Sequence, residues 1–262
     1  MANPNGTPIW FEYLGRDLEA ATGFYGKVVG WSIADSGMGG ADGMTYLVAT
    51  APDGDQVAGM MVNPAGDTPP TWLVYFGVED VDAAAGAMAG AGAQVQMPAV
   101  TMEGVGRMTM LADPQGAPFY VMRGASDEDS RAFKDYRHGD VTGHGVWVEL
   151  ATPDPMASIA FYTGHLGIAQ EGAMPMGELG DYSFLHAGET AIGAVMPVVM
   201  NARPGWLVYF GTDDIDAAVE RLKAAGGTLI QGPDQIPGGS YAVVAEDDAG
   251  ARFGFSGPRK GG

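Results

Sequence analysis

The chain has 262 residues, enough for two ordinary domains, and its 32 acidic and 13 basic side chains give a net charge of −19. This acidity disfavours nucleic acids and anionic membranes as partners, and the lack of cysteine excludes disulfides, thiolate nucleophiles and cysteine zinc sites. No apolar run approaches the ~18 residues of a spanning helix and the start does not read as a signal peptide, so we expect a cytoplasmic protein.

The first elements alternate between strand and helix patterns. An alternating strand is predicted over 9–14, followed by a helix that begins after Asp17, a good N-cap, and ends at Gly30. Strands are expected around 44–50 and 56–62, joined by a turn at 52–54. The pattern then restarts with a strand at 72–78, a helix from Asp80 to about Ala91, and strands near 93–97, 106–112 and 117–123.

The second half of the chain repeats the first. The hexamer WLVYFG occurs at 72–77 and again at 206–211, and the stretches 8–31, 66–95 and 112–121 match 145–168, 202–230 and 246–255 in the same order. A repeat of this length indicates duplicated structure. We therefore predict an α+β protein of four βαβββ units: units 8–65 and 66–124 in domain 1 (1–124), a linker (125–143), and units 144–200 and 201–258 in domain 2 (144–262).

This arrangement, together with phrases such as AFYTGHLG (160–167), FYGKVVGW (24–31) and ADPQG (112–116), resembles the vicinal oxygen chelate superfamily of glyoxalases, bleomycin resistance proteins and extradiol dioxygenases. The resemblance implies two glyoxalase-like domains. In each, two units would pair their sheets into an open eight-stranded cup with the helices outside. It does not by itself assign a function, because this scaffold supports several chemistries and some members only bind ligands.

The family's metal-ligand positions can be located by the resemblance. They fall on residues without hard-cation ligands: Trp10, Leu73, Met60 and Tyr120 in the first half, and Trp147, Leu207, Val195 and Gly254 in the second. The histidines lie elsewhere: His138 and His144 in or beside the linker, His165 at a helix end and His186 at a strand end. The sequence thus predicts no metal site and no cofactor, with a divalent metal kept as the alternative.

Strand alternation predicts which side chains face each cup. Trp10 and Glu12 lie opposite the apolar face of their strand, and Trp147 and Glu149 repeat this pattern. In WLVYFG the first residue faces the helices and the tyrosine faces the cup. The candidate ligand-binding residues are Trp10, Tyr46, Leu73, Tyr75 and Tyr120 in the first half, and Trp147, Tyr182, His186, Leu207, Tyr209 and Tyr241 in the second.

Glu12 and Glu149 are the candidate catalytic residues. A carboxylate in an aromatic cavity should have a raised pKa, which favours proton chemistry near neutral pH. The alternative is structural: each carboxylate accepts hydrogen bonds from tyrosine hydroxyls or backbone amides and stiffens its cup.

Three functions fit these features. The first is a metal-free protein, monomeric or homodimeric, whose partner is a small aromatic or cationic molecule bound in its cups. The second is a glyoxalase-like lyase or isomerase that uses metal or a pocket glutamate, so whether the chain is an enzyme stays open. The third is a structural protein with degenerate cups. We favour the first.

Overall fold

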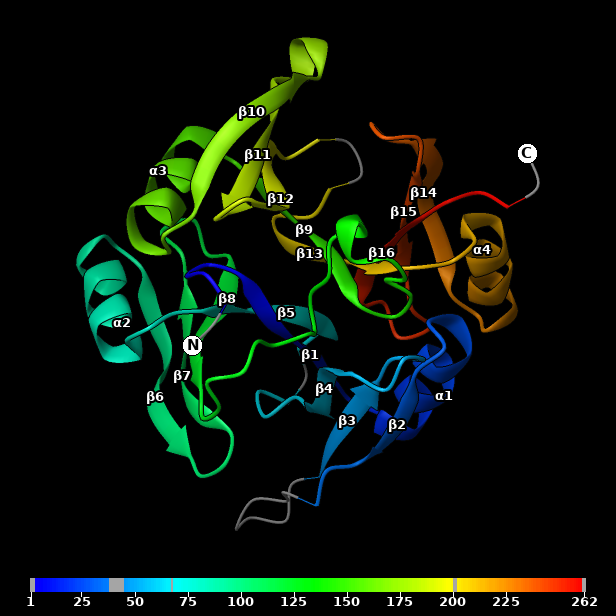
Figure 1. Ribbon diagram of the computed structural model, residues 1–262, viewed down its shortest axis with the longest axis horizontal. Helices are drawn as coiled ribbons and strands as arrows, with labels where there is room; N and C mark the ends of the chain where they lie inside the picture. Colours follow the sequence, from blue (N-terminus) through cyan, green and yellow to red (C-terminus); the bar gives the residue numbers. More distant parts are fainter. Residues whose placement is uncertain (1–2, 38–44, 67, 200–201, 261–262) are drawn as a thin grey trace. The chain divides into compact units, whose positions relative to one another are not determined.

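A computed structural model describes residues 3–37, 45–66, 68–199 and 202–260. Over these residues it has four α-helices, two short 3-10 turns and sixteen strands (Figure 1). The elements of the first half are β1 (Pro8–Gly15), α1 (Leu18–Val28), β2 (Ser32–Asp35), β3 (Tyr46–Thr50), β4 (Gln56–Val62), β5 (Thr71–Gly77), α2 (Val81–Gly90), β6 (Gln94–Met102), β7 (Gly106–Ala112) and β8 (Pro118–Gly124). After η1 (Tyr136–His138) come β9 (Gly145–Thr152), α3 (Pro155–His165), β10 (Ala169–Pro175), η2 (Gly177–Leu179), β11 (Asp181–Ala187), β12 (Thr190–Pro197), β13 (Gly205–Gly211), α4 (Ile215–Ala224), β14 (Thr228–Gln235), β15 (Tyr241–Glu246) and β16 (Arg252–Gly257).

The strands form two mixed eight-stranded sheets within the described residues. Their orders are β2-β3-β4-β1-β5-β8-β7-β6 and β10-β11-β12-β9-β13-β16-β15-β14, which repeat each other strand for strand. The α+β fold of βαβββ units paired into two domains is therefore confirmed. Strand β2 was not located from the sequence, because its four residues are mostly exposed and have no alternating apolar pattern.

The two compact units of the chain do not coincide with the two sheets. One unit comprises Met1–Ile9, Leu73–Ser130 and Val148–Trp206, and the other comprises Trp10–Trp72, Arg131–Trp147 and Leu207–Gly262. In the first unit α2 packs on α3, and in the second α1 packs on α4. The predicted domain boundaries at 124 and 144 stay a prediction, because each compact unit combines one βαβββ module from each half.

Each α-helix begins at an aspartate, as predicted for Asp17, Asp80, Asp154 and Asp214. Their carboxylates accept hydrogen bonds from the backbone N–H groups of Ala20, Ala83, Ala157 and Asp216 at 3.0–3.1 Å. These bonds satisfy donors that have no partner inside a helix. Helix α1 ends as expected at Gly30, whose φ of 88° is accessible to glycine without steric cost.

The tryptophan of each WLVYFG copy joins a buried polar chain on the helix side of its sheet. In the unit that contains α1, Trp72 Nε1 donates to the Tyr25 hydroxyl at 2.8 Å, which donates to Asp247 Oδ2 at 3.0 Å. The other Asp247 oxygen accepts the N–H groups of Ala249 and Ala251 in the β15–β16 turn. The strand, the helix and the turn are thus tied together inside an aromatic core.

The second unit contains the same chain of bonds. Trp206 Nε1 donates to the Tyr162 hydroxyl at 3.1 Å, which donates to Asp113 Oδ2 at 3.0 Å. Asp113 in turn holds the β7–β8 turn through two backbone N–H groups. The repeated hexamer therefore preserves a strand that is buried on both sides and carries one end of this network.

No helix within the described part of the chain is both long and apolar enough to cross a lipid bilayer.

Candidate functional site

Three predicted cup residues of the first half form a hydrogen-bonded chain. Trp10 Nε1 donates to the Tyr46 hydroxyl at 3.0 Å, and that hydroxyl donates to Glu12 Oε2 at 3.2 Å. Glu12 is only 3% exposed, so this bond partly offsets the cost of burying its carboxylate. The chain couples an indole, a phenol and a carboxylate on the inner face of β1 and β3.

Gly59 on β4 makes room for this chain. It lies opposite Glu12 on β1, and a Cβ atom there would come within 1.8 Å of the Tyr46 hydroxyl oxygen and 3.1 Å of Trp10 Nε1. No side chain larger than hydrogen fits while Tyr46 keeps its position. No sequence pattern identifies this glycine, because its role depends on the packing of two side chains from other strands.

The second half repeats the tyrosine–glutamate pair. Tyr182 donates to Glu149 Oε2 at 2.8 Å, and Glu149 is 8% exposed. The position that corresponds to Gly59 is Ala194, which lies opposite Glu149 in the parallel β9–β12 register. Both glutamates thus accept a tyrosine hydrogen bond, as the structural interpretation of these residues predicts, and the raised pKa expected for them stays a prediction.

Tyr75 and Tyr120 form a parallel aromatic stack. They are opposite each other in the β5–β8 register, their ring centroids are 4.1 Å apart and their planes differ by 3°. Leu73 lies two residues before Tyr75 on the same face of β5, and both residues are buried. The three side chains thus form a packed apolar cluster on one face of β5 and β8.

The corresponding residues of the second half pack differently. Tyr209 clusters with Val141 and Val146, and Trp147 and Leu207 pack against this cluster. His186 on β11 has a buried Nδ1 without a hydrogen-bond partner among the described residues. Tyr241 lies apart from the cluster, with the Arg259 guanidinium 4.1 Å from its ring centroid.

The residues at the positions that the resemblance assigns to metal ligands do not fit a divalent cation. Trp10 uses its only N–H to donate to Tyr46, Met60 and Val195 are fully buried in the sheet, and Gly254 has no side chain. Tyr120 stacks on Tyr75. Such a donor set lacks the imidazoles and carboxylates that these cations require.

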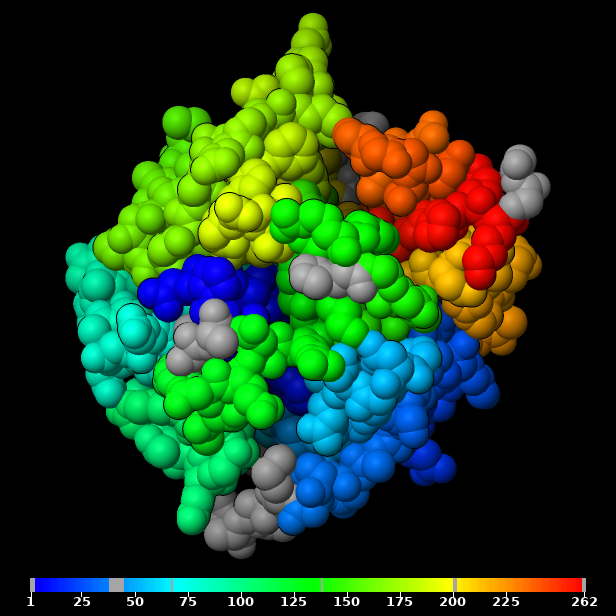
Figure 2. Space-filling model, in the orientation of Figure 1, coloured from blue at the N-terminus to red at the C-terminus, as the bar shows by residue number. Residues whose placement is uncertain are grey.

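An ion-pair cluster that sequence reasoning missed joins the linker to the β3–β4 turn. Ligand atoms of Asp53, Asp55 and His144 lie within 4.8 Å of one another. The Lys134 ammonium already occupies this group, 2.5 Å from Asp53, 3.0 Å from Asp55 and 3.1 Å from His144 Nε2. Figure 2 shows the green linker against the light-blue turn. The Lys134 ammonium thus supplies the positive charge of this cluster, and the cluster connects the linker to the β3–β4 turn.

Charge pairing dominates the protonation of this cluster. Burial alone would raise the pKa of Asp53, but hydrogen bonds from Lys134, the Asp55 backbone and His144 lower this pKa to about 2. His144 is fully buried, and its Nδ1 lies 2.6 Å from the Arg131 carbonyl oxygen, to which it can donate. No spacing rule in the sequence connects residues 53 and 144.

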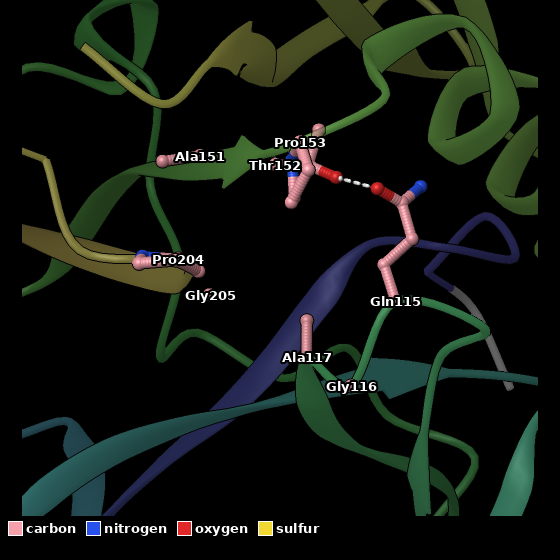
Figure 3. Close-up of a pocket in the computed structure, with 8 residues that line it drawn as sticks. All are labelled: Gln115, Gly116, Ala117, Ala151, Thr152, Pro153, Pro204 and Gly205. Carbon is pink, nitrogen blue, oxygen red and sulfur yellow. Dashed lines mark hydrogen bonds between the residues drawn. The ribbon is translucent and has the colours of Figure 1, made fainter.

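A small pocket lies beside the β7–β8 turn and is not a ligand site (Figure 3). Its volume is about 50 Å³, room for a few water molecules at most. The Gln115 side chain accepts hydrogen bonds from Thr152 Oγ1 at 2.5 Å and from the Asp154 backbone at 2.8 Å. Gln115 thereby connects the β7–β8 turn to the start of α3.

Comparison with known proteins decides the family. The family model described as the glyoxalase/bleomycin resistance protein/dioxygenase superfamily matches residues 9–121 and 145–255. The chain belongs to this superfamily. The match covers both halves, as expected for a tandem two-domain member of the glyoxalase superfamily.

Curated relatives align over almost their full length. The chain is 34% identical over 252 residues to "Putative glyoxylase CFP32" of Mycobacterium tuberculosis (strain CDC 1551 / Oshkosh), covering 95% of this chain and 93% of that protein. It is 32% identical over 263 residues to "Anthracycline biosynthesis protein DauV" of Streptomyces sp. (strain C5), covering 95% and 92%.

Solved structures share the fold at low sequence identity. The Mn(II)-bound glyoxalase from Novosphingobium aromaticivorans matches with a TM-score of 0.66 and 18% identity, covering 97% of this chain and 83% of that one. The 2,3-dioxygenase LapB from Pseudomonas sp. KL28 matches with a TM-score of 0.65 and 14% identity, covering 98% and 94%. These similarities establish the glyoxalase-superfamily fold and carry no assignment of activity.

Proposed function

We propose that this superfamily member binds a small planar aromatic molecule with a positive charge, without a metal. The observation that carries the proposal is the Trp10–Tyr46–Glu12 chain, in which a buried carboxylate lies at the end of an aromatic hydrogen-bond relay. An aromatic cation matches both components, because the rings offer stacking surface and the carboxylate offers a counter-charge.

The name of one relative supports an aromatic ligand. The relative DauV is named for anthracycline biosynthesis, and anthracyclines contain fused aromatic rings. Fused rings of this kind match the flat indole of Trp10.

Binding can be tested with 9-aminoacridine, a planar aromatic cation, and with acridine, its uncharged counterpart at neutral pH. We expect 9-aminoacridine to raise the melting temperature more than acridine does, because ligand that binds the folded state alone stabilises it. Replacing Glu12 by glutamine should remove the difference between the two compounds. Absence of any shift with 9-aminoacridine would contradict the proposal.

A glycine variant tests whether the Trp10–Tyr46–Glu12 chain forms the site. Gly59→Ala places a methyl group on the Tyr46 hydroxyl and should weaken 9-aminoacridine binding by about tenfold or more, the equivalent of one lost hydrogen bond. Gly23→Ala is the control, because a Cβ atom at this helical position meets nothing within 4 Å. Equal affinities in the two variants would exclude this chain from the site.

A second candidate is a lyase or isomerase in which Glu12 acts as a base without metal. It is favoured by the burial of Glu12 and by the glyoxylase designation of the relative CFP32. The test is conversion of the hemithioacetal of a 2-oxoaldehyde by protein freed of metal with a chelator. Turnover that Glu12→Gln abolishes would establish this candidate, and lack of turnover would leave the binding function alone.

A further inference from the structure

The linker covers the inner face of β13, β16 and β15 in its own compact unit. Thr142 forms a parallel bridge to Gly211 at the end of β13. Gly143 N–H donates to the Gly211 carbonyl at 2.9 Å, and Gly211 N–H donates to the His144 carbonyl at 2.8 Å. Figure 1 shows this green segment against β13 and β16. We call residues 141–144 the strap.

One side chain of the strap, that of Val141, packs on this face. Val141 is 5% exposed and packs in one cluster with Tyr209. Partly buried side chains close the cluster on its other sides: Trp147, Leu207, Ala242 and Val244. Trp147, Leu207 and Tyr209 were predicted to line the second cup, so Val141 takes up surface that a ligand would otherwise contact.

The equivalent positions of the two halves differ in size where the strap lies. Tyr75 pairs with Tyr120 on β8, whereas Tyr209 pairs with Gly254 on β16, over which its ring lies. The replacements continue along the same two strand pairs: Met122, Met108 and Met110 in the first half correspond to Ser256, Ala242 and Val244 in the second. Small residues in the second half thus leave the volume that Val141 occupies.

The strap is fastened by polar contacts as well as by packing. The Trp31 indole N–H donates to the Gly143 carbonyl at 2.7 Å inside the core. On the other side the ion-pair cluster of Lys134, His144, Asp53 and Asp55 holds the linker to the β3–β4 turn. Several buried contacts made at once favour a segment that stays in place.

We propose that the strap permanently occupies the β13–β16–β15 face and confines ligand binding to the first half of the chain. The position of the strap does not depend on the proposed binding function. The confinement of ligand to the first half rests on that function. Duplication made two equivalent faces, and the linker between the halves has converted one of them into core. A single ligand per chain follows.

Cysteine labelling tests the strap without any ligand, since the natural chain has no cysteine. Ser256→Cys and Met122→Cys place one thiol at equivalent positions, paired with Gly211 and Gly77. Ser256 is 3% exposed and contacts Tyr136 of the linker, whereas Met122 is partly exposed. A maleimide should react with the Ser256→Cys thiol on the order of tenfold or more slowly, because labelling requires the strap to open.

Releasing the strap should abolish the difference. Adding Lys134→Ala and Val141→Gly to Ser256→Cys should raise its labelling rate towards that of Met122→Cys, with near-ultraviolet circular dichroism confirming that the variant is folded. If this variant does not fold, the comparison of Ser256→Cys with Met122→Cys in the natural background still decides. Equal labelling rates of those two thiols would contradict the proposal that the strap stays on this face.

Calorimetric titration with 9-aminoacridine tests the second part. We expect one molecule per chain, bound about tenfold or more weakly in Gly59→Ala. Two molecules per chain, or one that Gly59→Ala leaves unchanged, would overturn the confinement to the first half while leaving the binding function intact. Absence of binding would overturn the proposed function instead, and the labelling comparison would still decide whether the strap exists.

Discussion

Single residues in this protein connect layers through buried polar groups rather than through apolar packing alone. Tyr25 reaches from α1 to both Trp72 and Asp247, and it is completely buried. Burial raises the pKa of Tyr25 well above its ordinary value, and the nearby Asp247 carboxylate adds to this rise. The hydroxyl therefore keeps its proton and donates a hydrogen bond to Asp247 at every ordinary pH.

Removing that hydroxyl should destabilise the fold. Tyr25→Phe leaves the Trp72 N–H buried without its partner and removes one of the hydrogen bonds to Asp247, which costs about 1–3 kcal/mol of unfolding free energy. Urea denaturation measures this loss. Tyr162→Phe should give a similar loss, because Tyr162 holds the same place between Trp206 and Asp113.

The exposed Thr228 on β14 provides the control for both variants. Thr228→Val also removes one hydroxyl, and it should change the unfolding free energy by no more than about 0.5 kcal/mol, as surface substitutions usually do. A loss in Thr228→Val as large as in Tyr25→Phe would show that the buried chain has no special role.

Among the elements, the linker is the one whose role differs most from the sequence-based expectation. It was predicted only as a connection between the domains, yet Val141 and the adjoining His144 are buried, and the backbone of Thr142 pairs with Gly211. Its ion pairs are partly shielded from water, so salt screens them less than it screens fully exposed pairs. The linker therefore belongs to the core of its unit.

The stability that the Asp53 ion pair contributes to the fold should depend on pH. The pKa of Asp53 is lowered from 3.8 to about 2 in the folded protein, so its contribution to stability is present above pH 3.8 and is lost as the pH falls through 2. Asp53→Asn should accordingly lower the unfolding free energy at pH 7, and the difference from the natural protein should shrink as the pH decreases from 4 to 2.

Chemical denaturation at a series of pH values measures this difference. Glu171→Gln is a suitable control, since Glu171 lies exposed on β10 outside the cluster. A difference between Asp53→Asn and the natural protein that stays constant down to pH 2 would contradict the role assigned to the Asp53 carboxylate.

The whole molecule carries far more negative than positive charge. Its net charge of −19 produces repulsion within the folded state that the ion pairs of Lys and Arg side chains offset only in part. This repulsion acts over distances comparable to the screening length, which falls from ~10 Å at 0.1 M salt to ~3 Å at 1 M. Salt should therefore affect stability at this scale.

We expect the thermal unfolding midpoint to rise as sodium chloride is increased from about 0.1 to about 1 M, because screening weakens the net repulsion. Differential scanning calorimetry measures the midpoint. A fall of the midpoint with salt would mean that the surface ion pairs, such as that of Arg107 with Asp82, stabilise the fold more than the excess charge destabilises it.

Much of the fold could be predicted because its signals are local and occur twice. The four aspartate caps, Gly30 at the end of α1 and the alternation in WLVYFG depend on neighbouring residues alone. The repeat then fixed the number of modules. Strand β2 was missed because an exposed edge strand needs no apolar pattern.

The candidate site could be predicted only as a set of residue types on one face of a strand. Alternation placed Trp10 with Glu12, but the bond of Tyr46 to both depends on the β3–β4 register and on Gly59. The same holds for the Tyr75–Tyr120 stack, which requires residues 45 positions apart to meet in register. Register is a property of assembled strands.

The sequence by itself determined the duplicated α+β architecture, the excess of negative charge and the absence of cysteine chemistry, because composition and short-range periodicity carry these properties. Only the tertiary structure decided that Trp72 ends in a buried bond to Tyr25, that Lys134 lies among Asp53, Asp55 and His144, and that the linker covers β13. Each of these depends on groups distant in the chain being brought within hydrogen-bond range, and such distances are set by packing rather than by spacing along the chain.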